Sequence, residues 1–337
     1  MKAPLAIACV FLGCCSNVMF LELLIKEDPG VGNLITFSQF LAISLEGFIF
    51  TSKFGKVERV IPLKQYMILV SMFFVTNVCN NYAFNFNVPI PLQLVFSSST
   101  LTANMIAGII IMKKKYESSK YVSVALITVG ILLCTFVSGK NVEHLQSITK
   151  PLELTTPLED FYRWMIGISL LTLGLFTLAG TGLYQETLTA NYGKHPKESL
   201  FYVHVLALPF FISLLPNIYK HFIIIVQSRP IEIIGFMIPR SILHLIGNLL
   251  TQYMCVCSIF KLITEYSSLT VTLVLTLRKF CSLLISVMYF NDAFTIYHWI
   301  GTIFVFSGTF MYTALESAMV SDAPKSVKYQ TRPELDE

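Results

Sequence analysis

Long apolar segments alternate with short polar segments along almost the whole chain. Each apolar segment is about 20 residues long, which is the length that a helix needs to cross roughly 30 Å of hydrocarbon. The pattern therefore predicts an all-α membrane protein with ten spans. Their expected ranges are 4–25, 31–51, 64–84, 89–112, 119–138, 161–187, 199–226, 233–260, 265–289 and 296–316.

The polar segments predict the connections and the ends of the protein. The longest of them, residues 139–160, is expected to be a loop because it is polar and contains Pro151 and Pro157. Residues 1–316 then form a single transmembrane domain. Residues 317–337 form a polar, charged tail that we expect to be disordered. The first apolar segment is too long for the core of a signal peptide, so we interpret it as a retained span.

Composition and charge agree with this interpretation. Hydrophobic residues make up 54% of the 337 residues and charged residues 13%, whereas soluble domains carry about 25% charged residues. The net charge of +4 belongs to the loops and does not indicate nucleic-acid binding. Lysine and arginine are concentrated in the connections after the second, fourth and sixth spans and in the tail. Because such residues favour the cytosolic side, we expect both termini in the cytosol.

All eight cysteines fall within apolar segments, so we expect no disulfide framework. Cys255 and Cys257 are close together but have no partner residues at metal-binding spacing. The chain also lacks a nucleophile–base constellation, a glycine-rich phosphate loop and an acidic metal motif. The sequence therefore predicts neither an enzyme, nor a metal site, nor a cofactor.

A weak internal repeat links the two halves of the chain, residues 1–138 and 161–316. At a constant offset, Gly130 falls on Gly308 and Thr135 falls on Thr313. Such a match can also arise by chance in apolar sequence. If each half has five spans, the second half is inverted relative to the first. Inverted repeats are typical of alternating-access carriers, whose substrate site lies between the halves near the midplane of the membrane.

The basic pair Arg278-Lys279 lies about half-way along the ninth predicted span. Each charge at the bilayer centre costs about 2.5–3.5 kcal/mol on translocon scales. Thr272, Thr276 and Ser282 share the helix face of Lys279 at steps of three or four residues. One interpretation is a site that binds phosphate groups, because arginine supplies a fork of donors and lysine a point charge. The alternative is an internal ion pair with Glu22, Glu46 or Glu186.

Amide side chains provide the other candidate contacts. Asn248 and Gln252 lie one turn apart on the eighth predicted span, with Tyr253 beside them. Asn81 lies on the third span and Gln39 on the second. Such side chains can bind a nucleobase or sugar hydroxyls, but they also form hydrogen bonds between helices in membrane bundles.

Several segments of the chain, taken in order, point to a family. They are FLGCCSNV at residues 11–18, NLITFSQF at 33–40, NNYA at 80–83, QETL at 185–188, TQY at 251–253 and TLRKF at 276–280. Together they closely resemble the UDP-xylose and UDP-N-acetylglucosamine transporters of solute carrier family 35, subfamily B. The resemblance covers nearly the whole chain except residues 139–160 and the tail.

The resemblance implies a drug/metabolite transporter fold in Golgi or endoplasmic reticulum membranes, and exchange of a cytosolic nucleotide sugar for lumenal UMP. It also implies that Arg278 and Lys279 contact the nucleotide phosphates. One departure concerns the fourth span, where family members often carry a basic residue just after the phenylalanine that matches Phe96. This chain has Ser97 there.

Three other functions stay open on the residues alone. The first is a carrier for another phosphorylated anion, such as a different nucleotide sugar or a sugar phosphate. The second is a membrane-embedded transferase, which would need an acidic or metal motif near the cavity. The third is a scaffold that transports nothing, for which the buried basic pair would have no explanation.

Overall fold

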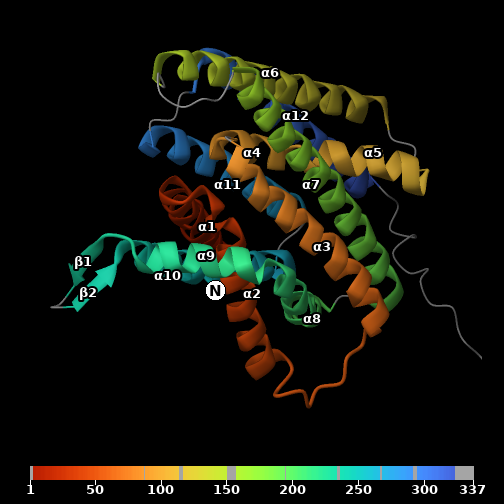
Figure 1. Ribbon diagram of the computed structural model, residues 1–337. Helices are drawn as coiled ribbons and strands as arrows, with labels where there is room; N and C mark the ends of the chain where they lie inside the picture. The colour runs from red at the N-terminus through yellow and green to blue at the C-terminus, as the bar shows by residue number, and fades with distance from the viewer. Residues whose placement is uncertain are drawn as a thin grey trace, which may run out of the picture.

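The computed structural model describes residues 3–322 apart from 87, 114–116, 150–156, 194, 234–235, 266–267 and 291–293. Within these residues the chain forms a bundle of long helices, and one β-hairpin projects from an end of the bundle (Figure 1). The helices are α1 (Ala3–Glu27), α2 (Gly32–Glu46), α3 (Leu63–Ala83), α4 (Ile90–Ser98), α5 (Thr100–Met112), α6 (Ser118–Thr149), α7 (Pro157–Tyr192), α8 (Pro196–Ala207), α9 (Leu215–Val226), α10 (Arg240–Glu265), α11 (Ser268–Phe290) and α12 (Ile296–Asp322). The hairpin pairs β1 (Pro230–Ile233) antiparallel to β2 (Phe236–Pro239).

The prediction of a helical membrane protein is confirmed, with the hairpin β1–β2 as an exception to the predicted all-α fold. In the described part of the chain, seven helical segments are long and apolar enough to cross a membrane, and the bent pair α4–α5 makes eight. These eight coincide with the first eight predicted spans. Helices α11 and α12 occupy the positions predicted for the ninth and tenth.

The fourth predicted span is not one straight helix. Helices α4 and α5 meet at Ser99 with a bend of 45°. The hydroxyl groups of Ser97 and Ser98 donate to the carbonyl oxygen of Leu94, and that of Thr100 donates to the carbonyl oxygen of Ser97. Side chains that bond to the carbonyls of the preceding turn compete with the helical backbone, which explains why the break lies in this run of hydroxyl residues.

Several predicted boundaries are wrong. The expected loop 139–160 is largely helical, because α6 continues to Thr149 and α7 begins at Pro157. Likewise α12 extends to Asp322, so residues 317–322 of the expected disordered tail are helical; residues 323–337 lie outside the described part. The hairpin replaces the first turns expected of the eighth span, and α10 begins only at Arg240. Bilayer thickness limits the apolar segment but not the helix, which polar residues can extend into water.

The expectation about cysteines is also wrong at one place. Cys14 of α1 and Cys255 of α10 form a disulfide, with their Cα atoms 4.8 Å apart. The helices come this close because Gly13 has no side chain: a methyl group there would lie 2.9 Å from the backbone nitrogen of Cys255. The two cysteines are 241 positions apart in the chain, so only the packing of α1 on α10 brings them together.

Helices α6 and α12 lie side by side (Figure 1) and pack closely against each other. Glycines lie in the contact between them. A methyl group at Gly130 would lie 2.5 Å from the carbonyl oxygen of Gly301 and 2.8 Å from Val305. A methyl group at Gly308 would lie 2.8 Å from the carbonyl oxygen of Ser123 and equally close to Ile127. Small residues thus let the two helix backbones approach, as is common in membrane bundles.

Candidate functional site

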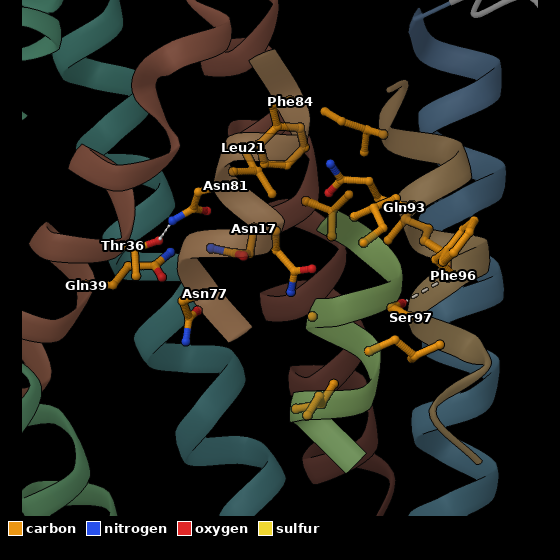
Figure 2. Close-up of a pocket in the computed structure, with 18 of the residues that line it drawn as sticks. Asn17, Leu21, Thr36, Gln39, Asn77, Asn81, Phe84, Gln93, Phe96 and Ser97 are labelled. Atoms are coloured by element: carbon orange, nitrogen blue, oxygen red, sulfur yellow. Dashed lines mark hydrogen bonds between the residues drawn. The ribbon is translucent and has the colours of Figure 1, made fainter. Parts of the chain in front are cut away.

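A cavity of about 290 Å³ lies inside the bundle among α1, α2, α3, α4, α7 and α10. Figure 2 shows amide side chains of α2 and α3 on one side of it, and Gln93, Phe96 and Ser97 of α4 on the other. Apolar residues such as Leu21 and Phe84 complete the wall. The polar lining consists of seven amides, namely Asn17, Gln39, Asn77, Asn80, Asn81, Gln93 and Gln252, with Thr36 and Ser97. An apolar wall with a limited set of convergent polar groups is typical of a small-molecule site.

Two of the predicted contacts, Gln39 and Asn248, are bonded to each other. The amide nitrogen of Gln39 donates to the side-chain oxygen of Asn248 over 2.7 Å. Asn248 is fully buried and exchanges hydrogen bonds with Asn17, from each side-chain amide to the other residue's backbone oxygen, at 3.2 and 2.9 Å. Asn248 therefore holds α10 against α1 and orients Gln39, whereas Gln39 itself lines the cavity.

The remaining predicted amides and Tyr253 are divided between the cavity and the surface. The side-chain nitrogen of Asn81 donates to the hydroxyl of Thr36 over 2.8 Å, and both residues line the cavity. Gln252 also lines it. Tyr253, in contrast, is 43% exposed, and its hydroxyl donates to Glu46 over 3.3 Å. The structure thus places Tyr253 away from the cavity wall.

The ammonium group of Lys279 donates to the backbone carbonyl oxygen of Ser97 over 2.7 Å. Ser97 lies in the last turn of α4, where carbonyl groups have no partner within the helix and the helix dipole is negative. Lys279 therefore caps the end of α4 at its break. The partner is a neutral carbonyl rather than a carboxylate, so the ammonium group is hydrogen-bonded but its positive charge is not neutralised.

Arg278 and Lys279 also line a second cavity of about 250 Å³, together with Ser98, Thr100 and Thr276. The Nε–H of Arg278 is buried, and no residue in the described ranges accepts its hydrogen bond. The last turn of α4 separates the two cavities, since Ser97 lines the first and Ser98 the second. The charged and the amide-rich regions are therefore neighbours.

The alternative of an internal ion pair finds no support among the described residues, where no carboxylate pairs with Arg278 or Lys279. Glu22 instead forms an ion pair with Lys26 at 3.5 Å and accepts a hydrogen bond from Ser286 at 2.5 Å. Glu46 accepts from Tyr253, as described above. The basic pair is thus available for an anionic ligand.

The other predicted residues of α11 are not equivalent. Thr276 lines the second cavity beside Arg278. Ser282 is buried and donates to the sulfur of Cys15 over 3.4 Å, so it faces α1. The side chain of Thr272 lies outside the described residues.

Sequence reasoning missed Asn17, Thr36, Gln93 and the carbonyl of Ser97. Gln93 stands alone as an amide in the apolar run of α4, which is a readable signal. The carbonyl of Ser97 carries no signal in the sequence, because every residue has one and only its position at a helix break makes it special. Nor do the described residues bring three or more His, Cys, Asp or Glu side chains together as a metal site.

A bundle of membrane-crossing helices around a polar cavity, with a basic pair in an adjoining wall, is the arrangement of a membrane transporter. The chain belongs to the UAA transporter family, whose model matches residues 2–316. The resemblance predicted from the sequence segments is thereby confirmed.

Curated relatives are similar over nearly their full length. An endoplasmic reticulum GDP-fucose transporter of Drosophila melanogaster is 51% identical, over 93% of this chain and 90% of the relative. A UDP-xylose and UDP-N-acetylglucosamine transporter of Danio rerio is 49% identical, over 95% of this chain and 96% of the relative. A nucleotide sugar transporter of Homo sapiens is 49% identical, over 93% and 94% respectively.

Proposed function

We propose that this protein carries UDP-N-acetylglucosamine, UDP-xylose or both from the cytosol into the Golgi lumen, in exchange for UMP. The endoplasmic reticulum is the alternative membrane. The observation that carries the proposal is the basic pair beside an amide-lined cavity, with no carboxylate to neutralise it among the described residues. The named substrates of the zebrafish relative support the choice of sugars.

In this proposal, Arg278 and Lys279 bind the phosphates, with Thr276 beside them. A phosphate oxygen forms a stronger, charge-assisted hydrogen bond with an ammonium group than a neutral carbonyl does. A bound ligand would therefore draw Lys279 away from Ser97. Since Ser97 takes the place where relatives often have a basic residue, the pair on α11 supplies the positive charge at the amide-lined cavity and at the cavity next to it. The amides of Gln39, Asn81 and Gln252 read the uncharged parts of the ligand.

The ten spans and their 5+5 inverted repeat belong to the same proposal, and packing supports them. If each span of one half is replaced by the equivalent span of the other half, the helix pair α1–α10 becomes the pair α7–α3. The two helices of each pair pack against each other in the structure. The shift that carries Gly130 to Gly308 also carries Ser123 to Gly301. The contact between Gly130 and Gly301 therefore has its counterpart in the contact between Gly308 and Ser123.

A second pair of contacts between α6 and α12 follows the same exchange. The sulfur of Cys134 donates to the carbonyl oxygen of His298 over 3.6 Å. The same offset relates Cys134 to Tyr312 and His298 to Lys120. The ammonium group of Lys120 lies 5.0 Å from the ring centre of Tyr312. Contacts at matching places with different chemistry are expected from two repeats that have diverged. With ten spans, both termini lie on the same side of the membrane, and the distribution of lysine and arginine favours the cytosolic side.

An empty carrier leaves both positive charges without an anion, which disfavours closure around an empty cavity. Ligand-bound forms then cross the membrane more readily than the empty form, so exchange is favoured over leak. UMP retains a phosphate for Arg278 and Lys279, and therefore suits the return step.

The test is uptake of UDP-N-acetylglucosamine into liposomes that contain the purified protein and are preloaded with UMP. We expect Lys279→Ala to abolish uptake, whereas Lys220→Ala, an exposed lysine on α9, should leave it unchanged. Uptake by Lys279→Ala at the wild-type rate would refute the phosphate role.

A second candidate is transport of a GDP-linked sugar, which the name of the Drosophila relative favours. Liposomes preloaded with GMP and supplied with GDP-fucose distinguish the two. If the GMP-loaded liposomes take up GDP-fucose and the UMP-loaded liposomes take up no UDP-sugar, the second proposal replaces the first.

A further inference from the structure

Gln93 differs from the other amides in the wall of the first cavity. Its side-chain Nε2 is buried, and no residue in the described part of the chain accepts a hydrogen bond from it. The corresponding nitrogens of Gln39, Asn77 and Asn81 all donate to other groups of the protein. An unsatisfied buried donor is rare in a native structure and destabilises it, so each case calls for an explanation. A ligand bound in the cavity would accept this hydrogen bond and so explain the unsatisfied donor.

The position of Gln93 relates it to the basic pair. Ser97, whose carbonyl oxygen binds Lys279, comes four residues after Gln93 on α4. Residues four apart lie on one face of a helix, about 6 Å apart along its axis. Gln93 and Ser97 both line the first cavity (Figure 2). Gln93 is therefore one helical turn away from the place where Lys279 enters the wall.

The covalent structure of a nucleotide sugar indicates which part of the ligand lies one helical turn from the site that binds the phosphates. The sugar is attached directly to the outer phosphate, whereas the base is separated from the phosphates by the ribose. A donor one turn from the phosphate anchor is near enough to bond to hydroxyl groups of the attached sugar or of the ribose, and UDP, which keeps the ribose and lacks the sugar, separates these two partners. The base extends further, toward the amides of α2 and α3 on the opposite wall in Figure 2.

We infer that Gln93 is a sugar-binding residue, whose amide donates a hydrogen bond to a hydroxyl oxygen of the transported sugar. This inference rests on the proposed function and extends it, because it assigns a residue to the part of the substrate that UDP and UMP both lack. It predicts that Gln93 contributes to the binding of UDP-sugars and not to the binding of UDP or UMP.

The experiment compares Gln93→Met with the wild type, because methionine keeps the length of the side chain and removes the donor. Dissociation constants of UMP, UDP, UDP-xylose and UDP-N-acetylglucosamine are measured on the purified full chain, together with the melting temperature without ligand. Loss of one hydrogen bond predicts roughly five- to tenfold weaker binding of the UDP-sugars. Binding of UMP and of UDP should stay within about twofold, because neither carries the sugar. Gln185→Met, at an exposed position of α7, is the matched control and should change neither.

The melting temperature separates this role from a structural one. Removing an unsatisfied buried donor should leave the melting temperature of the ligand-free protein unchanged or higher. A lower melting temperature would show that Gln93 supports the fold instead. Equal weakening of UDP and UDP-sugar binding, which would place Gln93 at the outer phosphate, or no weakening of any ligand would also overturn the inference.

Lys279→Ala distinguishes failure of the inference from failure of the proposed function. If Lys279→Ala loses binding of both ligands while Gln93→Met retains both, the proposed function stands and the role of Gln93 is refuted. If the wild-type protein binds no uridine nucleotide at all, both are refuted together.

Discussion

Replacing Lys279 by methionine should abolish transport without destabilising the protein. Lys279 lies near the middle of α11 and, within the described residues, its ammonium group bonds to a neutral carbonyl and to no carboxylate. A lysine at the centre of a membrane helix costs about 2.5–3.5 kcal/mol. The charge-assisted hydrogen bond to Ser97 returns about 1.5–3 kcal/mol. The substitution should therefore change the free energy of unfolding by between about zero and 2 kcal/mol in the stabilising direction.

The assay is the melting temperature of the purified, ligand-free protein, read beside uptake into liposomes. One kcal/mol corresponds to roughly 2–4 °C in a protein of 150–250 residues, so we expect the melting temperature to be unchanged or a few degrees higher. Under the proposed function, UMP and UDP-sugars should raise the melting temperature of the wild type by mass action and should no longer raise that of the variant. A fall of 5 °C or more would refute the reasoning, because it would show that capping the end of α4 is the main role of Lys279.

The remaining predictions concern the packing of the helices. Gly130→Ala should lower the melting temperature, because its methyl group would lie 2.5 Å from the carbonyl oxygen of Gly301. Gly182→Ala is the matched control: the nearest atom lies 3.9 Å away, so it should be neutral or stabilising, and an equal loss in both variants would contradict this account. Alkylation of the denatured, unreduced protein should modify six cysteines, with Cys14 and Cys255 reacting only after reduction. Modification of all eight before reduction, measured by mass spectrometry, would exclude the disulfide.

The membrane helices were largely predictable, because the thickness of hydrocarbon imposes a length on each apolar segment. The ends of α6, α7 and α12 were not, since helices continue into water where no such length applies. The run of hydroxyl residues from Ser97 to Thr100 is a sign in the sequence of the break between α4 and α5. The bend of 45° at this break nevertheless depends on which carbonyls the hydroxyl groups reach, and that is a property of the folded backbone.

The candidate site was predictable in part for a different reason. Arg278 and Lys279 are conspicuous in an apolar segment because buried charge is costly, and that cost requires an explanation in any fold. Amides are less informative, since the same side chain can bind a ligand or join two helices. Asn248 and Gln39 illustrate this: they are bonded to each other, and only Gln39 lines the cavity.

The sequence by itself determined that the chain crosses the membrane as helices, that it resembles a transporter family, and that a basic pair lies within one span. Each of these follows from local composition or from a short segment. Tertiary structure alone decided that the carbonyl of Ser97 receives Lys279, that the amide donor of Gln93 is buried in a cavity wall, and that Cys14 meets Cys255. These features join helices far apart in the chain. They depend on the approach of backbones, which no local pattern of side chains encodes.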